Sequence, residues 1–156
     1  MPRHKTVLVR WKDQSAYIDK RIAPLILELW KAEIATVNSC EENRPGWMWI
    51  EFLYVTDAER FLNIVARYEH GIRSFYNRIR QAWEFGDRPL TDAWEYDVYP
   101  FDLSVEETEV DGAISESSSG PSDFVFSMCV RFPRSDYHKL LYRMRRYNRG
   151  TTKPTR

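Results

Sequence analysis

The stretch WMWIEF at residues 47–52 alternates large side chains and constrains the fold more than any other part of the chain. In an extended strand, successive side chains point to opposite faces of the sheet. Met48, Ile50 and Phe52 can therefore fill a core, and the two tryptophans must then face the other way. What these two indoles contact is the central question about function.

Composition predicts one soluble domain, which we place at residues 1–147. The chain of 156 residues can bury a core of its own. Its 23 Lys and Arg balance 23 Asp and Glu, so a preference for nucleic acid requires a local patch. The chain has only two cysteines, which argues against a disulfide framework and favours a reducing cytoplasm. Their spacing does not match a metal-binding motif, so we expect neither a metal site nor a cofactor. The sequence has no apolar run long enough for a membrane span, and its start lacks the features of a signal peptide, so we expect neither.

Hydrophobic spacing predicts the order β-α-β-β-α-(α)-β-β-α. Period-two alternation indicates strands at 6–11, 34–38, 47–54, 93–103 and 123–132, with a turn-rich loop at 39–46. Three- and four-residue spacing indicates helices at 18–33, 58–68, 72–83 and 137–147. Each helix has a single apolar stripe, which favours an α+β fold with all helices on one face of an antiparallel sheet. We expect a ferredoxin-like plait.

Two segments are expected to lie outside the packed core. Residues 104–123 carry acidic but no basic side chains and predict a flexible loop. Residues 148–156 form a basic tail that we expect to be disordered.

A strand–helix pattern occurs twice. Ile50-Glu51-Phe52 and the helix after Thr56 match Val130-Arg131-Phe132 and the helix after Ser135. In the second strand, one face is expected to hold Phe124, Phe126, Met128, Val130 and Phe132. The pattern indicates a strand–loop–strand–helix unit used twice, although convergence of two amphipathic pairs gives a similar match.

The segment GWMWIEF at residues 46–52, followed by Asp57-Ala58-Glu59, resembles the third strand and following helix of an RNA-recognition motif. The resemblance covers residues 6–68. It implies a βαββαβ plait, and it maps the family's base-stacking aromatic residues onto Trp47 and Trp49.

Three interpretations of the tryptophans remain open. The chain itself, through the 72–83 helix or the last helix, or a second copy can bury them. Alternatively they form a docking surface for a protein partner or homodimer. The residues of that surface would be Trp47, Trp49, Glu51 and Arg131. The third interpretation is single-stranded RNA binding by the same face together with a basic patch. That patch comprises Arg143, Arg145, Arg146 and Arg149.

No enzyme motif is present, so we expect a non-catalytic binding or regulatory domain. One residue keeps an enzymatic alternative open. Cys40 in NSCEEN could act as a thiol nucleophile if a base or helix terminus lowered its pKa. Glu41 and Glu42 beside it favour the opposite shift, and no histidine is adjacent in sequence.

Overall fold

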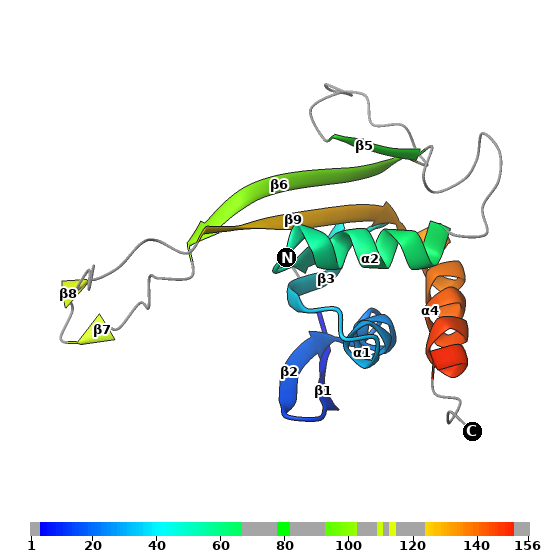
Figure 1. Ribbon diagram of the computed structural model, residues 1–156, viewed down its shortest axis with the longest axis horizontal. Helices are drawn as coiled ribbons and strands as arrows, with labels where there is room; N and C mark the ends of the chain where they lie inside the picture. Colours follow the sequence, from blue (N-terminus) through cyan, green and yellow to red (C-terminus); the bar gives the residue numbers. More distant parts are fainter. Residues whose placement is uncertain are drawn as a thin grey trace.

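The computed structural model describes residues 4–66, 78–81, 93–102, 109–110, 113–114 and 124–151 (Figure 1). Helices and antiparallel strands both occur, which confirms the α+β class. The described helices are α1 (Ala23–Lys31), α2 (Val55–Ala66) and α4 (Tyr137–Thr151), with a 3-10 turn η2 (Arg134–Asp136). The described strands are β1 (Thr6–Trp11), β2 (Gln14–Asp19), β3 (Thr36–Arg44), β4 (Trp47–Phe52), β5 (Ile79–Gln81), β6 (Trp94–Asp102), β7 (Glu109–Val110), β8 (Ala113–Ile114) and β9 (Phe124–Pro133).

The main sheet has the strand order β3-β4-β9-β6-β5, and all neighbours are antiparallel except β5 and β6. At its centre β4 pairs with β9, and Ile50 lies directly opposite Val130. The flanking pairs of the same face are Met48 with Phe132 and Phe52 with Met128. All six side chains are buried, so the alternation in WMWIEF does point one set of residues into the core.

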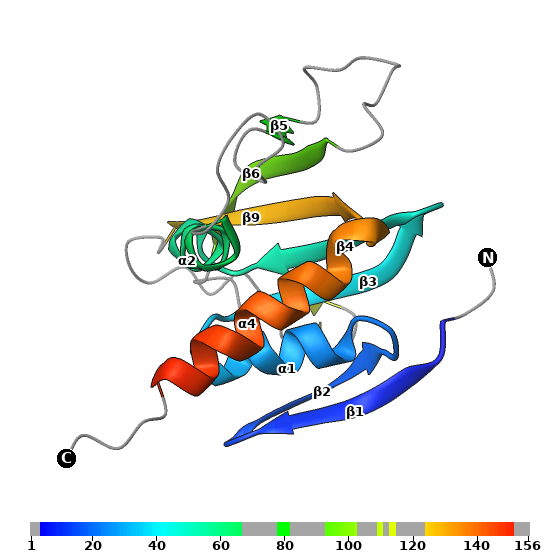
Figure 2. The same ribbon diagram turned by 90° about the vertical axis from the view of Figure 1, so that its right-hand side faces the viewer.

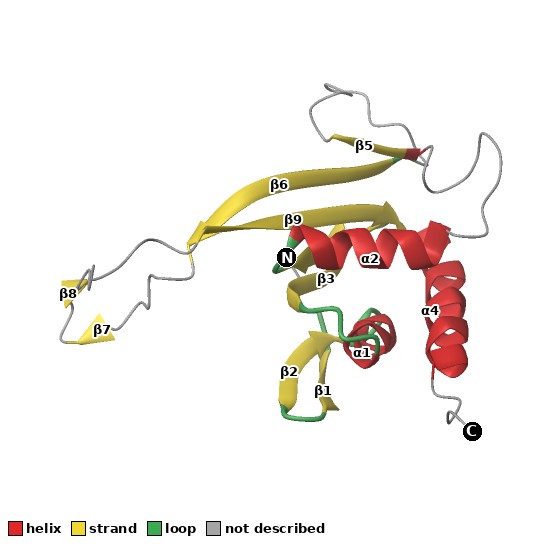
Figure 3. Cartoon of the chain, in the orientation of Figure 1, coloured by secondary structure: helices red, strands yellow, loops and turns green. Residues whose placement is uncertain are grey.

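The helices lie on that face of the sheet (Figures 2 and 3). Buried side chains of all three helices, such as Leu29, Phe61 and Leu140, join the strand residues in one hydrophobic cluster. The ring of Phe61 stacks between Phe52 and Trp94, and Trp94 also stacks on Phe132. Each fully buried apolar side chain of this size contributes about 1.5–3 kcal/mol, so this cluster dominates stability.

Among the described residues the first strand does not join the main sheet, so the strand order differs from that of the expected ferredoxin-like plait. Within the described part of the chain β1 pairs only with β2, through the register Thr6 opposite Asp19 to Trp11 opposite Gln14. The helix predicted from residue 18 begins at Ala23, and Ile18 lies in β2. Proline lacks the N–H that a helix needs after its first turn. Pro24 is thus compatible with a start at Ala23 and incompatible with one at residue 18.

Three other boundaries differ from the predictions. β3 continues to Arg44 through most of the expected loop at 39–46. Of the helix predicted at 72–83, residues 79–81 form strand β5 instead, because they pair with β6. Residues 72–77 and 82–83 lie outside the described residues. Helix α4 extends to Thr151, so residues 148–151 belong to a helix rather than to the expected tail. The side-chain amide of buried Asn148 donates to the backbone carbonyl and to the carboxylate of Glu28, at 2.9 and 2.8 Å. Within the predicted acidic loop, only the short β7–β8 pair is described.

The twofold pattern seen in the sequence corresponds to a symmetric arrangement in the sheet. β3, β4 and α2 form one ββα unit, and β6, β9 and α4 form another. In the sequence match Trp49 corresponds to Cys129 and Glu51 to Arg131; in the sheet Trp49 lies opposite Arg131 and Glu51 opposite Cys129. The two units are therefore related by a local twofold axis that passes through the Ile50–Val130 pair and exchanges β4 with β9.

A buried carboxylate joins the second unit to β5. Asp136 accepts hydrogen bonds from both terminal nitrogens of the Arg78 guanidinium, at 2.8 and 3.1 Å. It also accepts one from the indole N–H of Trp94 at 2.9 Å. Because Trp94 is fully buried, this carboxylate fixes the position of a large aromatic side chain in the core.

We predict that Asp136→Ala destabilises the protein by about 3–5 kcal/mol, since it removes the counter-ion of a half-buried guanidinium and an acceptor inside the core. Urea unfolding followed by circular dichroism measures the loss. The matched control is Glu33→Ala, which breaks the Lys12–Glu33 pair whose side chains are 65% and 75% exposed. That variant should lose less than about 1 kcal/mol. Equal losses in the two variants would contradict a structural role for the buried pair.

Candidate functional site

The residues predicted to form a binding surface lie on the sheet face opposite the helices. Trp49 lies opposite Arg131 in the neighbouring strand, and Glu51 lies opposite Cys129. These side chains alternate with the buried core residues of β4 and β9, so they face outward. Trp47 and Trp49 are half-buried rather than bare.

Neighbouring charged residues cover part of the first indole. The guanidinium of Arg44 lies 4.2 Å from the ring centre of Trp47, within range of a cation–π interaction. The same guanidinium donates to the carboxylate of Glu95 on β6 at 2.6 Å. Arg44 is placed here by a two-residue turn whose Gly46 has φ +79°, a conformation that favours glycine. The last helix is on the opposite face and does not cover the tryptophans.

A second polar cluster occupies the middle of this face. Arg131 donates to Asp97 of β6 at 3.0 Å. Burial raises the pKa of Glu51 above its usual value. Burial also raises the pKa of the Cys129 thiol, and the nearby Glu51 carboxylate adds to that shift. The outward face is therefore a partly desolvated layer of aromatic and charged groups.

Beyond this layer, β6 and β9 continue as a two-stranded ribbon that projects past the helices (Figure 1). Its described residues include four exposed apolar side chains: Val98 at 47%, Phe101 at 39%, Phe124 at 63% and Phe126 at 60%. The register with β6 confirms the prediction that Phe124 and Phe126 share the face of Met128. Their face continues that of the core, but these two rings are exposed.

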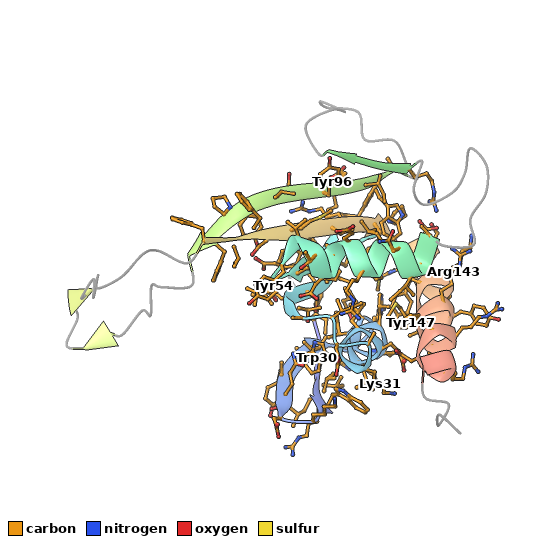
Figure 4. The ribbon with its side chains drawn as sticks, in the orientation of Figure 1. Trp30, Lys31, Tyr54, Tyr96, Arg143 and Tyr147 are labelled. Atoms are coloured by element: carbon orange, nitrogen blue, oxygen red, sulfur yellow. The ribbon has the colours of Figure 1, made fainter. Side chains whose placement is uncertain are left out.

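The predicted basic patch is divided over α4. Arg143 is half-buried and donates to the backbone carbonyl of Val65 near the end of α2 (Figure 4). Arg145 and Arg149 border a surface hollow of about 440 Å³ beside Trp11, and Arg146 borders a separate one. Since α4 packs against the inner face of the sheet, none of these side chains adjoins the tryptophan face.

Cys40, the candidate nucleophile, lies on edge strand β3 directly opposite Trp49. The fold brings two residues to it that are distant in sequence. The Nδ1 atom of His4 lies 3.7 Å from the Cys40 Sγ atom and 2.9 Å from the Asp19 Oδ2 atom. No local spacing could have indicated this cluster, because the three residues come from separate segments.

The arrangement differs from a nucleophilic Cys–His–Asp triad. In such a triad the two imidazole nitrogens have different partners, one the thiol and the other the carboxylate. Here the same nitrogen of His4 is closest to both groups. Burial raises the pKa of the Cys40 thiol; the Glu42 backbone opposes this shift, and the Asp19 carboxylate adds to it. A raised pKa lowers the fraction of thiolate, the reactive form, at neutral pH.

We predict a pH-dependent effect of Glu51→Gln on stability. A carboxyl whose pKa is raised in the folded state binds its proton more tightly when folded, so wild-type stability falls as pH rises from the ordinary value of 4.5 towards the raised one. The amide stays neutral and avoids that loss. The melting temperature of Glu51→Gln relative to wild type should therefore increase between pH 4 and 7. Glu59→Gln, at an exposed site on α2, is the control; parallel curves for the two variants would contradict the burial effect.

Comparisons with known proteins show similarity but no family. No family model matches the chain, and no solved structure matches it. One curated relative is an uncharacterized protein of Acanthamoeba polyphaga mimivirus, 28% identical over 123 residues. The match covers 77% of this chain but only 57% of that protein. Among the described residues, no helix is long and apolar enough to cross a membrane.

Proposed function

We propose that this domain is a non-catalytic binding module that associates with a second copy of itself. Its docking surface would be the open strand edge and the exposed apolar side chains of the projecting β6–β9 ribbon, beyond the part of the sheet that carries Trp49 on its outward face. The observation that carries the proposal is the exposure of Val98, Phe124 and Phe126 on one face of that ribbon, with Phe101 exposed on the other face. Contiguous exposed apolar side chains of this size are typical of interaction sites.

The strand edges of the ribbon support a partner that adds to the sheet. Within the described residues, β5 pairs with β6 only at 94–96, and β4 pairs with β9 only from Met128 to Pro133. The rest of each outer edge has backbone groups that could pair with another strand. Pro100 cannot donate a hydrogen bond and makes the β6 edge less suitable. The edge of β9 at 124–126 is therefore the better docking edge, whereas Ser127 is buried and its hydroxyl donates to the backbone carbonyl of Leu53.

A second copy fits this edge better than an unrelated protein. Two β9 strands related by a twofold axis pair antiparallel, so each copy covers the exposed Phe124 and Phe126 of the other. The formal net charge of zero gives no long-range repulsion between copies.

The RNA interpretation receives less support from the geometry. It needs the indoles and the basic patch on one surface, whereas they lie on opposite sides of the sheet. Stacking of a base on Trp47 would also have to displace the guanidinium of Arg44. In addition, β1, the counterpart of the first strand of the RNA-recognition motif, pairs outside the main sheet.

We predict that the wild-type protein is a dimer and that Phe124→Ser/Phe126→Ser is a folded monomer. Size-exclusion chromatography with light scattering measures the mass, and circular dichroism checks the fold. Tyr17→Ser is the control, because Tyr17 is 74% exposed on the β1–β2 hairpin and remote from the ribbon. It should remain a dimer.

A wild-type monomer at all concentrations would contradict self-association. Absorbance at about 260 nm that disappears in high salt would instead support the RNA interpretation, since phosphate contacts weaken as salt rises.

A further inference from the structure

We infer that His4, Asp19 and Cys40 form a zinc-binding site. The Nδ1, Oδ2 and Sγ atoms of these residues all lie within 4.8 Å of one another. The three residues are half-buried, so the site is shielded but reachable from solvent. A thiolate, an imidazole and a carboxylate are the three ligand types that zinc uses in proteins.

The observed separations agree with one ion held by all three atoms. Zinc–nitrogen and zinc–sulfur bonds of about 2.05 and 2.3 Å at a tetrahedral angle place the two ligand atoms about 3.6 Å apart. The distance between Nδ1 of His4 and Sγ of Cys40 is 3.7 Å. The corresponding nitrogen–oxygen separation is about 3.3 Å, against 2.9 Å to Asp19. A shift of the carboxylate by a few tenths of an ångström would admit the ion.

The shared nitrogen favours a metal over proton transfer. One imidazole nitrogen placed near both a thiol and a carboxylate cannot relay a proton between them through the ring, but it can bind the same ion that they bind. The thiol also excludes magnesium and calcium, which prefer oxygen ligands alone. Three protein ligands leave one tetrahedral position for a non-protein ligand.

Backbone contacts hold the carboxylate in place. The Oδ2 atom of Asp19 accepts a hydrogen bond from the backbone N–H of Glu41 at 3.0 Å. The carboxylate of Glu41 in turn accepts from the backbone N–H of Arg21 at 2.7 Å. Such outer contacts orient metal ligands and typically matter 10–100-fold for affinity.

The site would also have a structural effect. Asp19 ends β2 and His4 precedes β1, whereas Cys40 belongs to the edge of the main sheet. An ion bound by all three would cross-link the separate β1–β2 hairpin to that edge. Because zinc would bind this folded arrangement and not the unfolded chain, it should raise thermal stability.

Untagged protein, purified and stripped with a chelator, is titrated with Co²⁺ and Zn²⁺. We expect one equivalent of Co²⁺ to bind with a thiolate-to-cobalt charge-transfer absorption band, which Zn²⁺ then displaces. Cys40→Ser should lose the band, and His4→Ala should bind at least tenfold more weakly. The matched control is Cys129→Ser, because Cys129 is the other cysteine and its thiol donates to the hydroxyl of Tyr99, away from His4 and Asp19. It should keep the band.

Melting temperatures with and without Zn²⁺ give an independent readout. The increase expected for wild type and Cys129→Ser should be absent in His4→Ala, whose residue precedes the first strand and is outside the core. Absence of stoichiometric binding by wild type, or a thiolate band retained in Cys40→Ser, would overturn the inference. If Cys40→Ser fails to fold, unchanged Co²⁺ affinity in His4→Ala would overturn it equally. All these variants leave the ribbon phenylalanines intact, so the test is separate from that of self-association.

Discussion

The antiparallel pairing of β4 with β9 is the interaction on which the rest of the structure depends. Its central pair, Ile50 and Val130, sets the register of the whole sheet. A slip by one residue would turn every core side chain of a strand to the other face. The register is held because three consecutive inward pairs are buried beneath the helices. The two ββα units are thereby joined edge to edge in one sheet, through strands β4 and β9.

This pairing also separates the two faces of the sheet. The inner face is apolar and covered, whereas the outer face combines half-buried indoles with the Arg44–Glu95 and Arg131–Asp97 ion pairs. β6 and β9 are longer than the helical layer beside them, so their far ends expose large apolar side chains. The proposed self-association surface is a consequence of that difference in length.

Local patterns were sufficient where one element decides its own conformation. The alternation in WMWIEF correctly divided Met48, Ile50 and Phe52 from the outward-facing residues. The pattern was insufficient at Ile18, whose spacing to Ile22 and Leu25 also fits a helix. Gln14–Asp19 is a strand because a two-residue turn lets it pair with β1. Lys12 in that turn has φ +52°, and lysine gives none of the sequence signals typical of such a turn.

The sequence by itself determined the α+β class, the inward face of β4 and the recurrence of a strand–helix unit, because each depends on neighbours close in the chain. Only the tertiary structure decided that the first strand forms a separate hairpin, that Arg44 stacks on Trp47, and that His4, Asp19 and Cys40 meet. The physical reason is that these contacts join segments whose separation no periodic pattern encodes. They form only when the packed core fixes where each strand ends.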